Sequence, residues 1–140
     1  MNNGFYFEEL KIGQRIPELG IKIIPEKNKQ YCRIVKEINP LHYNLKYAQS
    51  LGYKDIVIAG VFTYSFFTKT ITDWIGENGK IKELEICFQN PAYENDTLIH
   101  KGILIDKKII NNKKFIKVEI QSENQDGEHL ATAKFIIEIK

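Results

Sequence analysis

The sequence has 140 residues, which suits one ordinary domain, and we expect a single domain over residues 1–140. Hydrophobic residues make up 43% and charged residues 27%, the balance of a soluble globular protein that buries a core without metal or disulfide bonds. The formal net charge is only +2 and the basic residues are scattered, which argues against a nucleic-acid-binding protein.

The two cysteines, Cys32 and Cys87, are far apart and form no CxxC pair, which argues against a disulfide framework or a zinc site. We expect both to be small buried hydrophobic residues. Polar residues and then Glu8 and Glu9 follow Met1, so no signal peptide is evident, and no apolar run approaches the ~20 residues that a membrane span requires. These observations predict a cytoplasmic protein without a membrane partner.

The first third of the chain predicts a lead-in segment and two short helices. Residues 5–24 form the lead-in, and Pro25 suits the first turn of a helix over residues 25–35 that turns Tyr31 and either Ile34 or Val35 inward. Proline disfavours helical geometry in the residue before it, so residues 36–42, around Asn39-Pro40, should form an ordered loop. Asn44 is a suitable cap for a second short helix, which Gly52 ends.

The longest predicted helix runs from Gly60 to about Ile75 and ends at Gly76. Its apolar residues cover most of the helix circumference, so we expect the helix to be enclosed rather than to lie on a surface. They are Val61, Phe62, Tyr64, Phe66, Phe67, Ile71, Trp74 and Ile75.

The rest of the chain predicts four antiparallel strands. Alternating apolar residues indicate strands near residues 83–88, 97–106, 115–122 and 131–139, with turns at Asn111-Asn112 and Asp126-Gly127. A sheet that follows one enclosed helix suggests an α+β architecture in which the antiparallel sheet wraps around the long central helix. His100 and His129 lie in or beside these strands without a partner at metal-ligand spacing, so we expect structural or solvent-facing roles.

Glu37 and His42 are the candidate proton-transfer residues, because both residue types exchange protons near neutral pH and both flank the Asn-Pro loop. The helix start at Gly60 offers free amides and a partial positive charge, with no side chain in the way. Together these groups suit chemistry next to a carbonyl. Taken alone, however, a histidine after a proline loop and a glutamate beside a lysine are more often surface residues.

Residues 37–42, Glu-Ile-Asn-Pro-Leu-His, resemble the Gly-Asp-x-Asn-Pro-x-His motif of MaoC-like dehydratases and (R)-specific enoyl-CoA hydratases. The similarity continues through Ile58-Ala59-Gly60 and Ala131-Thr132-Ala133. Residues 88–98 resemble the family segment Phe-x-x-Pro-Val-x-x-Gly-Asp-x-Leu. The resemblance therefore covers nearly the whole chain in the right order.

The resemblance implies a hotdog fold and a dimer that binds an acyl thioester, carried by CoA or acyl carrier protein, without a cofactor or metal. It implies that Glu37 takes a proton from water as the water attacks C3 of a trans-2-enoyl thioester, that His42 manages the proton at C2, and that Asn39 braces the loop. The Gly60 amide would stabilise the enolate-like oxygen. Aromatic residues at helical spacing are more often core residues, but those in this region are also candidates for an acyl tunnel: Tyr43, Phe62, Tyr64 and Phe66.

Two departures from the family pattern leave alternatives open. Lys36-Glu37 replaces the family's Gly-Asp, and the longer Glu arm adds about one bond of ~1.5 Å. Ala59 stands where the family often has histidine. The chain is therefore either an active hydratase, as a homodimer or higher assembly, or a weak or inactive acyl-binding subunit of a heteromeric dehydratase. A hotdog thioesterase is disfavoured, because residues 60–72 contain no Asp or Glu.

Overall fold

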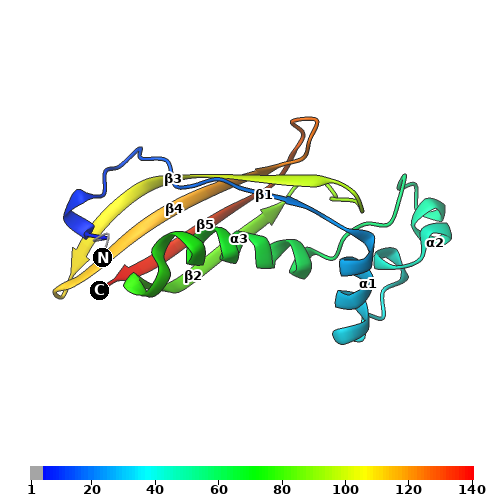
Figure 1. Cartoon of the computed structure of the whole chain (residues 1–140), viewed down its shortest axis with the longest axis horizontal. Helices are drawn as coiled ribbons and strands as arrows, with labels where there is room; N and C mark the ends of the chain where they lie inside the picture. Colours follow the sequence, from blue (N-terminus) through cyan, green and yellow to red (C-terminus); the bar gives the residue numbers. More distant parts are fainter. Residues whose placement is uncertain (1–4) are drawn as a thin grey trace.

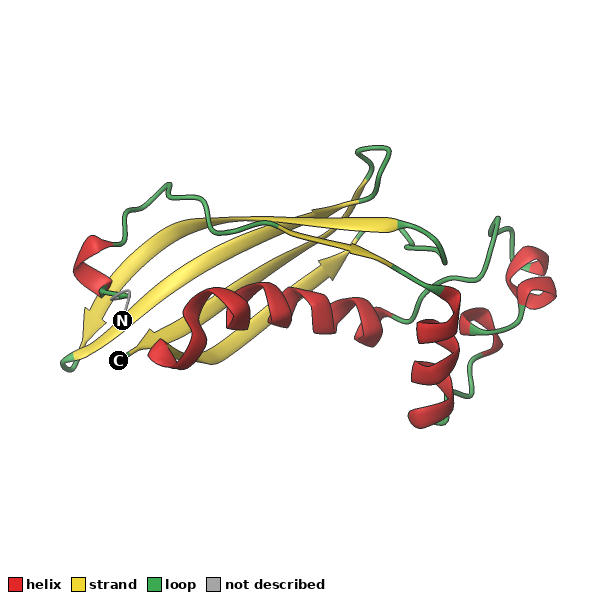
Figure 2. Ribbon diagram, viewed as in Figure 1, coloured by secondary structure: helices red, strands yellow, loops and turns green. Residues whose placement is uncertain are grey.

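The computed structural model describes residues 5–140, which form one curved antiparallel sheet with a long helix lying along its concave face (Figure 1). The strand order is β1-β3-β4-β5-β2. Figure 2 shows α1 (Pro25–Ile34), η2 (Pro40–His42) and α2 (Leu45–Ser50) gathered at one end of the sheet, whereas η1 (Phe7–Glu9) lies at the other end. The strands are β1 Leu19–Lys22, β2 Gly79–Phe88, β3 Thr97–Ile110, β4 Lys113–Glu123 and β5 His129–Ile139. The helices are η1 Phe7–Glu9, α1 Pro25–Ile34, η2 Pro40–His42, α2 Leu45–Ser50, α3 Gly60–Ile75 and η3 Gly76–Asn78.

Alternating burial along the strands explains the sheet. In β5 every second residue faces inward, and the predicted inward set is buried: Ala131, Ala133, Phe135, Ile137 and Ile139. The predicted turn at Asn111-Asn112 joins β3 to β4, and both residues have positive φ (50° and 64°), as asparagine tolerates in a tight hairpin. The predicted α+β architecture, a sheet around a central helix, is confirmed.

The four predicted strands are present as β2 to β5, and the sheet of the described chain contains a fifth strand that the sequence did not predict. The missed strand, β1, is a four-residue edge strand that contains Gly20 and pairs with β3. Short edge strands with an interior glycine give little alternation for a pattern to detect.

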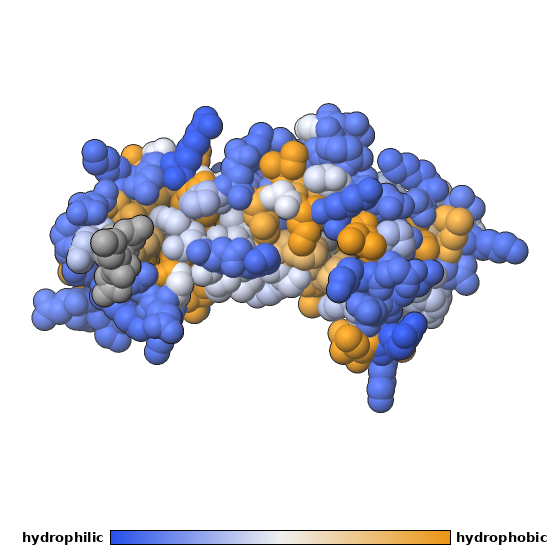
Figure 3. Space-filling view, viewed as in Figure 1, coloured by the Kyte–Doolittle hydropathy of each residue, from blue (hydrophilic) through white to orange (hydrophobic). Residues whose placement is uncertain are grey.

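The predicted central helix begins at Gly60 and ends before Gly76 (φ 53°) as expected, but it is not enclosed in the single chain. One face buries Phe67, Ile71 and Ile75 against the sheet, whereas Val61 is 68% exposed. Only one face meets the sheet, which leaves the outer face open. Figure 3 shows apolar and weakly polar side chains across the middle of the molecule, between ends where charged side chains predominate.

The short helices differ from expectation in which residues they bury. In α1 the buried residues are Asn28 and Cys32, whereas Ile34 (79% exposed) and Val35 face solvent, so the predicted inward positions were wrong there. Cys87 is also exposed, although Cys32 is buried as predicted, and both thiols are free. The predicted cap of α2 is confirmed, because the Asn44 side chain accepts a hydrogen bond from an amide of the first turn.

Two hydrophobic clusters hold the molecule together. The larger one packs α3 on the sheet, and the smaller one joins the short helices to the sheet through Ile23, Ile58, Ala92, Leu98 and Leu130. Phe5 packs on Trp74 at the last turn of α3, and the amide of Lys140 donates to the carbonyl of Asn78. No helix among residues 5–140 is long and apolar enough to cross a membrane.

Candidate active site

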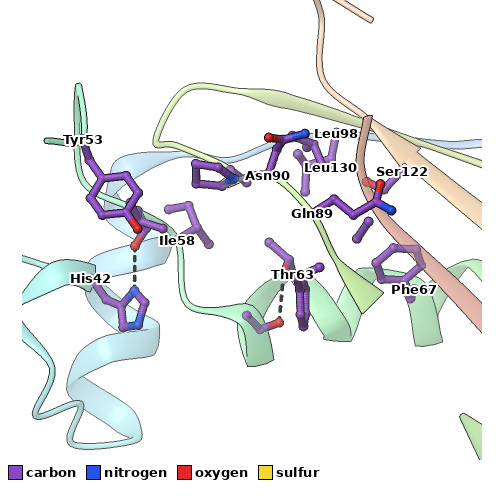
Figure 4. A pocket seen from close by; sticks show the side chains of 16 residues that line it. His42, Tyr53, Ile58, Thr63, Phe67, Gln89, Asn90, Leu98, Ser122 and Leu130 are labelled. Carbon is purple, nitrogen blue, oxygen red and sulfur yellow. Dashed lines mark hydrogen bonds between the residues drawn. The ribbon is translucent and has the colours of Figure 1, made fainter. Parts of the chain in front are cut away.

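A cavity of about 330 Å³ lies at the N-terminal end of α3, where the short helices meet the sheet (Figure 4). Helix α3 contributes Gly60, Thr63 and Phe67 to its wall, and η2 contributes His42. The ends of β3 and β4 contribute Leu98 and Ser122, and most of the remaining lining side chains are apolar. The cavity is thus an apolar chamber with a histidine and a helix N-terminus in its wall, the form typical of a small-molecule site.

His42 is held in one tautomer by the backbone. Its Nδ1 lies 2.7 Å from the carbonyl oxygen of Val57, drawn as a dashed line in Figure 4. A carbonyl oxygen only accepts, so neutral His42 carries its proton on Nδ1 and leaves Nε2 free to exchange a proton. The His42 amide also donates to the Asn39 carbonyl, and the Val57 amide donates to the Leu41 carbonyl. The histidine is therefore fixed from both sides.

Asn28, which the sequence did not indicate as a site residue, anchors the loop that contains His42 to helix α1. It is fully buried, and its Nδ2 donates at 3.0 Å both to the backbone oxygen of His42 and to Oε1 of Glu94. The Sγ of Cys32 lies 3.5 Å from the same His42 oxygen. Burial, together with the carboxylates of Glu37 and Glu94, raises the pKa of the Cys32 thiol, which keeps it a protonated donor.

The end of α1 explains where Glu37 lies. The Lys36 amide donates to the Arg33 carbonyl and the Glu37 amide donates to the Cys32 carbonyl, the hydrogen-bond pair of a Schellman motif. Lys36 takes the left-handed position (φ 54°) that glycine normally fills, and this is the position of the motif glycine in the family pattern. Lys36 thus adopts a backbone conformation that glycine takes with less strain.

Glu37 itself is directed toward its own loop. Its Oε1 accepts a hydrogen bond from the Asn39 amide at 3.0 Å, and Glu37 is not among the residues that line the cavity. Asn39 is exposed and braces the loop, because its Oδ1 accepts from the Leu41 amide at 3.1 Å. The structure therefore places His42 and Gly60 at the cavity, and Glu37 and Asn39 in the adjoining loop.

The N-terminus of α3 offers hydrogen-bond donors to the cavity. The first amides of a helix have no partner within the helix, and no side chain caps this end of α3 in the described chain. A Cβ on Gly60 would lie 3.3 Å from the ring of Phe88, so glycine lets that ring approach the helix start. The hydroxyl of Thr63 donates to the Gly60 carbonyl at 2.8 Å, which turns it away from the free amides.

The four aromatic residues predicted to bind substrate do not line this cavity. Phe62 and Phe66 line a separate apolar groove of about 480 Å³ between β1, α1 and α3, where Phe62 stacks on Tyr31 with ring centroids 4.9 Å apart. Tyr43 is 46% exposed and Tyr64 is 41% exposed. Their role in substrate binding remains a prediction.

The segment around the cavity is strongly basic. Residues 22–54 contain seven Lys or Arg and two Glu, a net charge of +5, although the whole chain carries only +2. Lys54 lies over the ring of Tyr93, with Nζ 4.7 Å from the ring centroid. This segment, which contributes His42 and Tyr53 to the cavity, therefore carries a net positive formal charge, and such a charge attracts anionic ligands.

A curved antiparallel sheet around a long helix, with an apolar chamber at the helix N-terminus, defines a protein of the hotdog class. Solved structures share the fold. An (R)-hydratase from A. caviae involved in PHA biosynthesis matches with a TM-score of 0.83 at 15% identity, over 95% of this chain and 99% of that one. The ChsH1–ChsH2 complex from Mycobacterium tuberculosis matches with a TM-score of 0.81 at 22% identity, over 93% of this chain and 98% of that one. The expected hotdog fold is confirmed.

The chain belongs to the family described as the MaoC like domain, whose model matches residues 9–125. It is 24% identical over 97 residues to the mitochondrial 3-hydroxyacyl-[acyl-carrier-protein] dehydratase FERN of Solanum lycopersicum, a match that covers 69% of this chain and 58% of that protein. It is 24% identical over 119 residues to the beta subunit of a 3-oxo-4,17-pregnadiene-20-carboxyl-CoA hydratase of Mycobacterium tuberculosis, covering 85% of this chain and 89% of that one. The family resemblance is thus confirmed.

Proposed function

We propose that the protein hydrates trans-2-enoyl thioesters to (R)-3-hydroxyacyl thioesters and catalyses the reverse dehydration. The observation that carries this proposal is that one apolar cavity is lined both by His42, with its Nε2 free, and by Gly60 at an uncapped helix N-terminus. Hydration needs a proton-transfer group and a donor to the thioester oxygen, and both line that cavity.

In the proposed reaction a water oxygen bonds to C3 while the double bond between C2 and C3 opens. Charge then develops on the thioester oxygen, where the Gly60 amide and the positive end of α3 stabilise it. Glu37 accepts the proton that the water loses. His42 enters the step with a proton on both ring nitrogens, delivers the one on Nε2 to C2 and returns to the neutral Nδ1–H form. Transfer of the proton from Glu37 back to Nε2 closes the cycle. The apolar wall strengthens these interactions, because it excludes bulk water from the charged groups.

Glu37 reaches the cavity only if its side chain releases the Asn39 amide and turns. That requirement favours a second candidate function, an acyl-thioester-binding subunit with little activity of its own, which works beside a catalytic partner. The observation behind it is the hydrogen bond from the Asn39 amide to Oε1, made while Glu37 stays outside the cavity wall. The similarity to the beta subunit of a hydratase supports it as well.

The carrier of the acyl group is anionic in either function. The basic segment over residues 22–54 suits both the phosphates of CoA and the acidic surface of an acyl carrier protein. The exposed outer face of α3 supports an assembly of two or more chains, either copies of this one or a heteromer. Free thiols at Cys32 and Cys87 suit the reducing cytoplasm.

The test is the loss of enoyl absorbance when the purified protein meets crotonyl-CoA. Activity that disappears in His42→Ala and Glu37→Ala supports the hydratase, whereas equal activity in both variants refutes the assigned pair. An inactive wild type that binds acyl-CoA supports the binding subunit. Turnover restored by Glu37→Asp in that case would assign the defect to the longer arm of glutamate.

A further inference from the structure

A polar pair that the proposed reaction does not use lies at the wall of the cavity that the sheet forms: Ser122 lines the cavity, and His100 lies behind it. Leu98 and Ser122 line the cavity, and His100 follows Leu98 on the same face of β3. The register pairs His100 with Ser122 across β3 and β4. The His100 ring stacks on Phe67, another cavity residue, with centroids 4.3 Å apart. A hydroxyl that lines the cavity and a buried imidazole behind the wall are therefore cross-strand neighbours.

The hydrogen bonds of His100 determine which of its nitrogens is free. Thr70 donates its hydroxyl proton to the Phe66 carbonyl at 2.8 Å, so its oxygen can only accept from His100 Nδ1, which lies 3.3 Å away. The proton of the ring is thus on Nδ1, and Nε2 is a bare acceptor turned away from Thr70. His100 is fully buried, and Nε2 has no partner among the described protein atoms.

We propose that His100 and Ser122 form a polar subsite for an acyl thioester that carries a hydroxyl group on its chain. This inference rests on the proposed function, since it assigns the far end of the same acyl cavity. The hydroxyl of the ligand accepts from the hydroxyl of Ser122 in the cavity wall and donates to Nε2 of His100, which it reaches by displacing the side chains that cover that nitrogen.

The chemistry of the pair selects a hydroxyl over other groups. Burial lowers the pKa of His100 to about 4, so the ring is neutral near pH 7 and offers a lone pair rather than a positive charge. A carboxylate has no proton to give to that lone pair and would have to lose its water in an apolar wall. A plain alkyl chain leaves the buried acceptor unpaired, which weakens binding relative to the hydroxylated chain.

Calorimetric titration of the full chain tests this independently of turnover. The probes are saturated acyl-CoA pairs of six, eight and ten carbons, each with and without a hydroxyl on the last carbon. At the chain length that reaches the pair, wild type should bind the hydroxylated ligand about tenfold more tightly, the effect of one good hydrogen bond. Ser122→Ala and His100→Leu should abolish the preference, whereas His100→Gln, which keeps an acceptor, should retain part of it.

Ser50→Ala is the matched control, because Ser50 is exposed on α2 and donates only to the Tyr47 carbonyl. Equal binding of both ligands at every length overturns the inference, as does a preference that survives in Ser122→Ala. If His100→Leu does not fold, the wild-type comparison and Ser122→Ala decide the matter. If the protein hydrates crotonyl-CoA but shows no preference for the hydroxylated ligand, the subsite proposal fails and the hydratase proposal stands. If it prefers the hydroxylated ligand but does not hydrate crotonyl-CoA, the hydratase proposal fails and the subsite proposal stands.

Discussion

Replacing Asn28 with alanine tests whether the buried hydrogen bonds beneath the loop hold His42 in place. The change removes two donated bonds of 3.0 Å, one to the His42 carbonyl and one to the Glu94 carboxylate. A bond to a neutral acceptor contributes about 1 kcal/mol and one to a charged acceptor about 2 kcal/mol, and the His42 carbonyl then keeps the Cys32 thiol as its only side-chain donor among the described residues. We expect the free energy of unfolding to fall by about 3 kcal/mol.

The loop should also shift, because the His42 carbonyl loses its anchor on α1. A displacement near 1 Å lowers a rate by roughly 10²-fold, so kcat with crotonyl-CoA should fall far more than the apparent affinity for acyl-CoA. Asn28→Asp keeps the shape but turns a carboxylate toward Glu94, and it should cost more stability, about 4 kcal/mol near neutral pH. Acid should relieve part of that loss as the new carboxyl group protonates.

Urea unfolding and steady-state kinetics of the two variants supply the measurements. Asn78→Ala is the control, since its Nδ2 likewise donates to a backbone carbonyl, that of Ile75 at 2.9 Å, but at the opposite end of α3. It should leave kcat unchanged. Asn28→Ala with wild-type kcat and a stability loss below about 0.5 kcal/mol would show that the loop keeps its place without this anchor.

Three further changes have defined outcomes. Lys36→Gly should raise the free energy of unfolding by about 1 kcal/mol in urea titrations, because a left-handed residue (φ 54°) costs least as glycine, and no gain would contradict the strain assigned to Lys36. Gly60→Ala should lower kcat by about 10²-fold in the crotonyl-CoA assay, because its Cβ meets the Phe88 ring at 3.3 Å beside the oxyanion donors; an unchanged kcat would show that the added methyl group leaves those donors undisturbed. The pKa of His100 is about 4 in the folded chain, against 6.5 in the unfolded chain. Between pH 6.5 and pH 4 the unfolded chain therefore binds the proton more readily than the folded chain. The free energy of unfolding should fall by about 3 kcal/mol as the pH is lowered through this window. His100→Leu should lack this component when unfolding is followed across that range, and an identical pH profile would contradict the buried neutral ring.

The sequence predicted the parts of the fold that rest on periodic burial. Alternating apolar and polar residues predicted β5 and its hairpin partner β4, because every second side chain of a strand faces α3. It missed β1, whose four residues are held mainly by pairing with β3, a contact distant in the chain. It also could not say which sides of the central helix face the sheet and which face solvent, because apolar residues cover most of its circumference.

Only those residues of the candidate site that belong to a sequence motif could be predicted. His42 and Gly60 line one cavity, as the resemblance suggested, whereas Asn28 had no signal because an asparagine in mid-helix looks like a solvated residue. Phe62 and Phe66 lie on the same helix as residues that line the cavity, but they line a different groove. Helical spacing alone does not tell residues of the groove from residues of the cavity. The direction of Glu37 depends on a rotamer and a loop hydrogen bond, which residue spacing does not determine.

The positions of Phe5 and Lys140 have a practical consequence. Both contact the last turn of α3 or the residues just beyond it, whereas the cavity lies at the first turn of this 16-residue helix. At 1.5 Å per residue, about 24 Å of helix separates them from Gly60. A fluorophore or an affinity handle attached beside Phe5 or Lys140 would therefore stand clear of the cavity, which makes these positions well suited to immobilised binding assays.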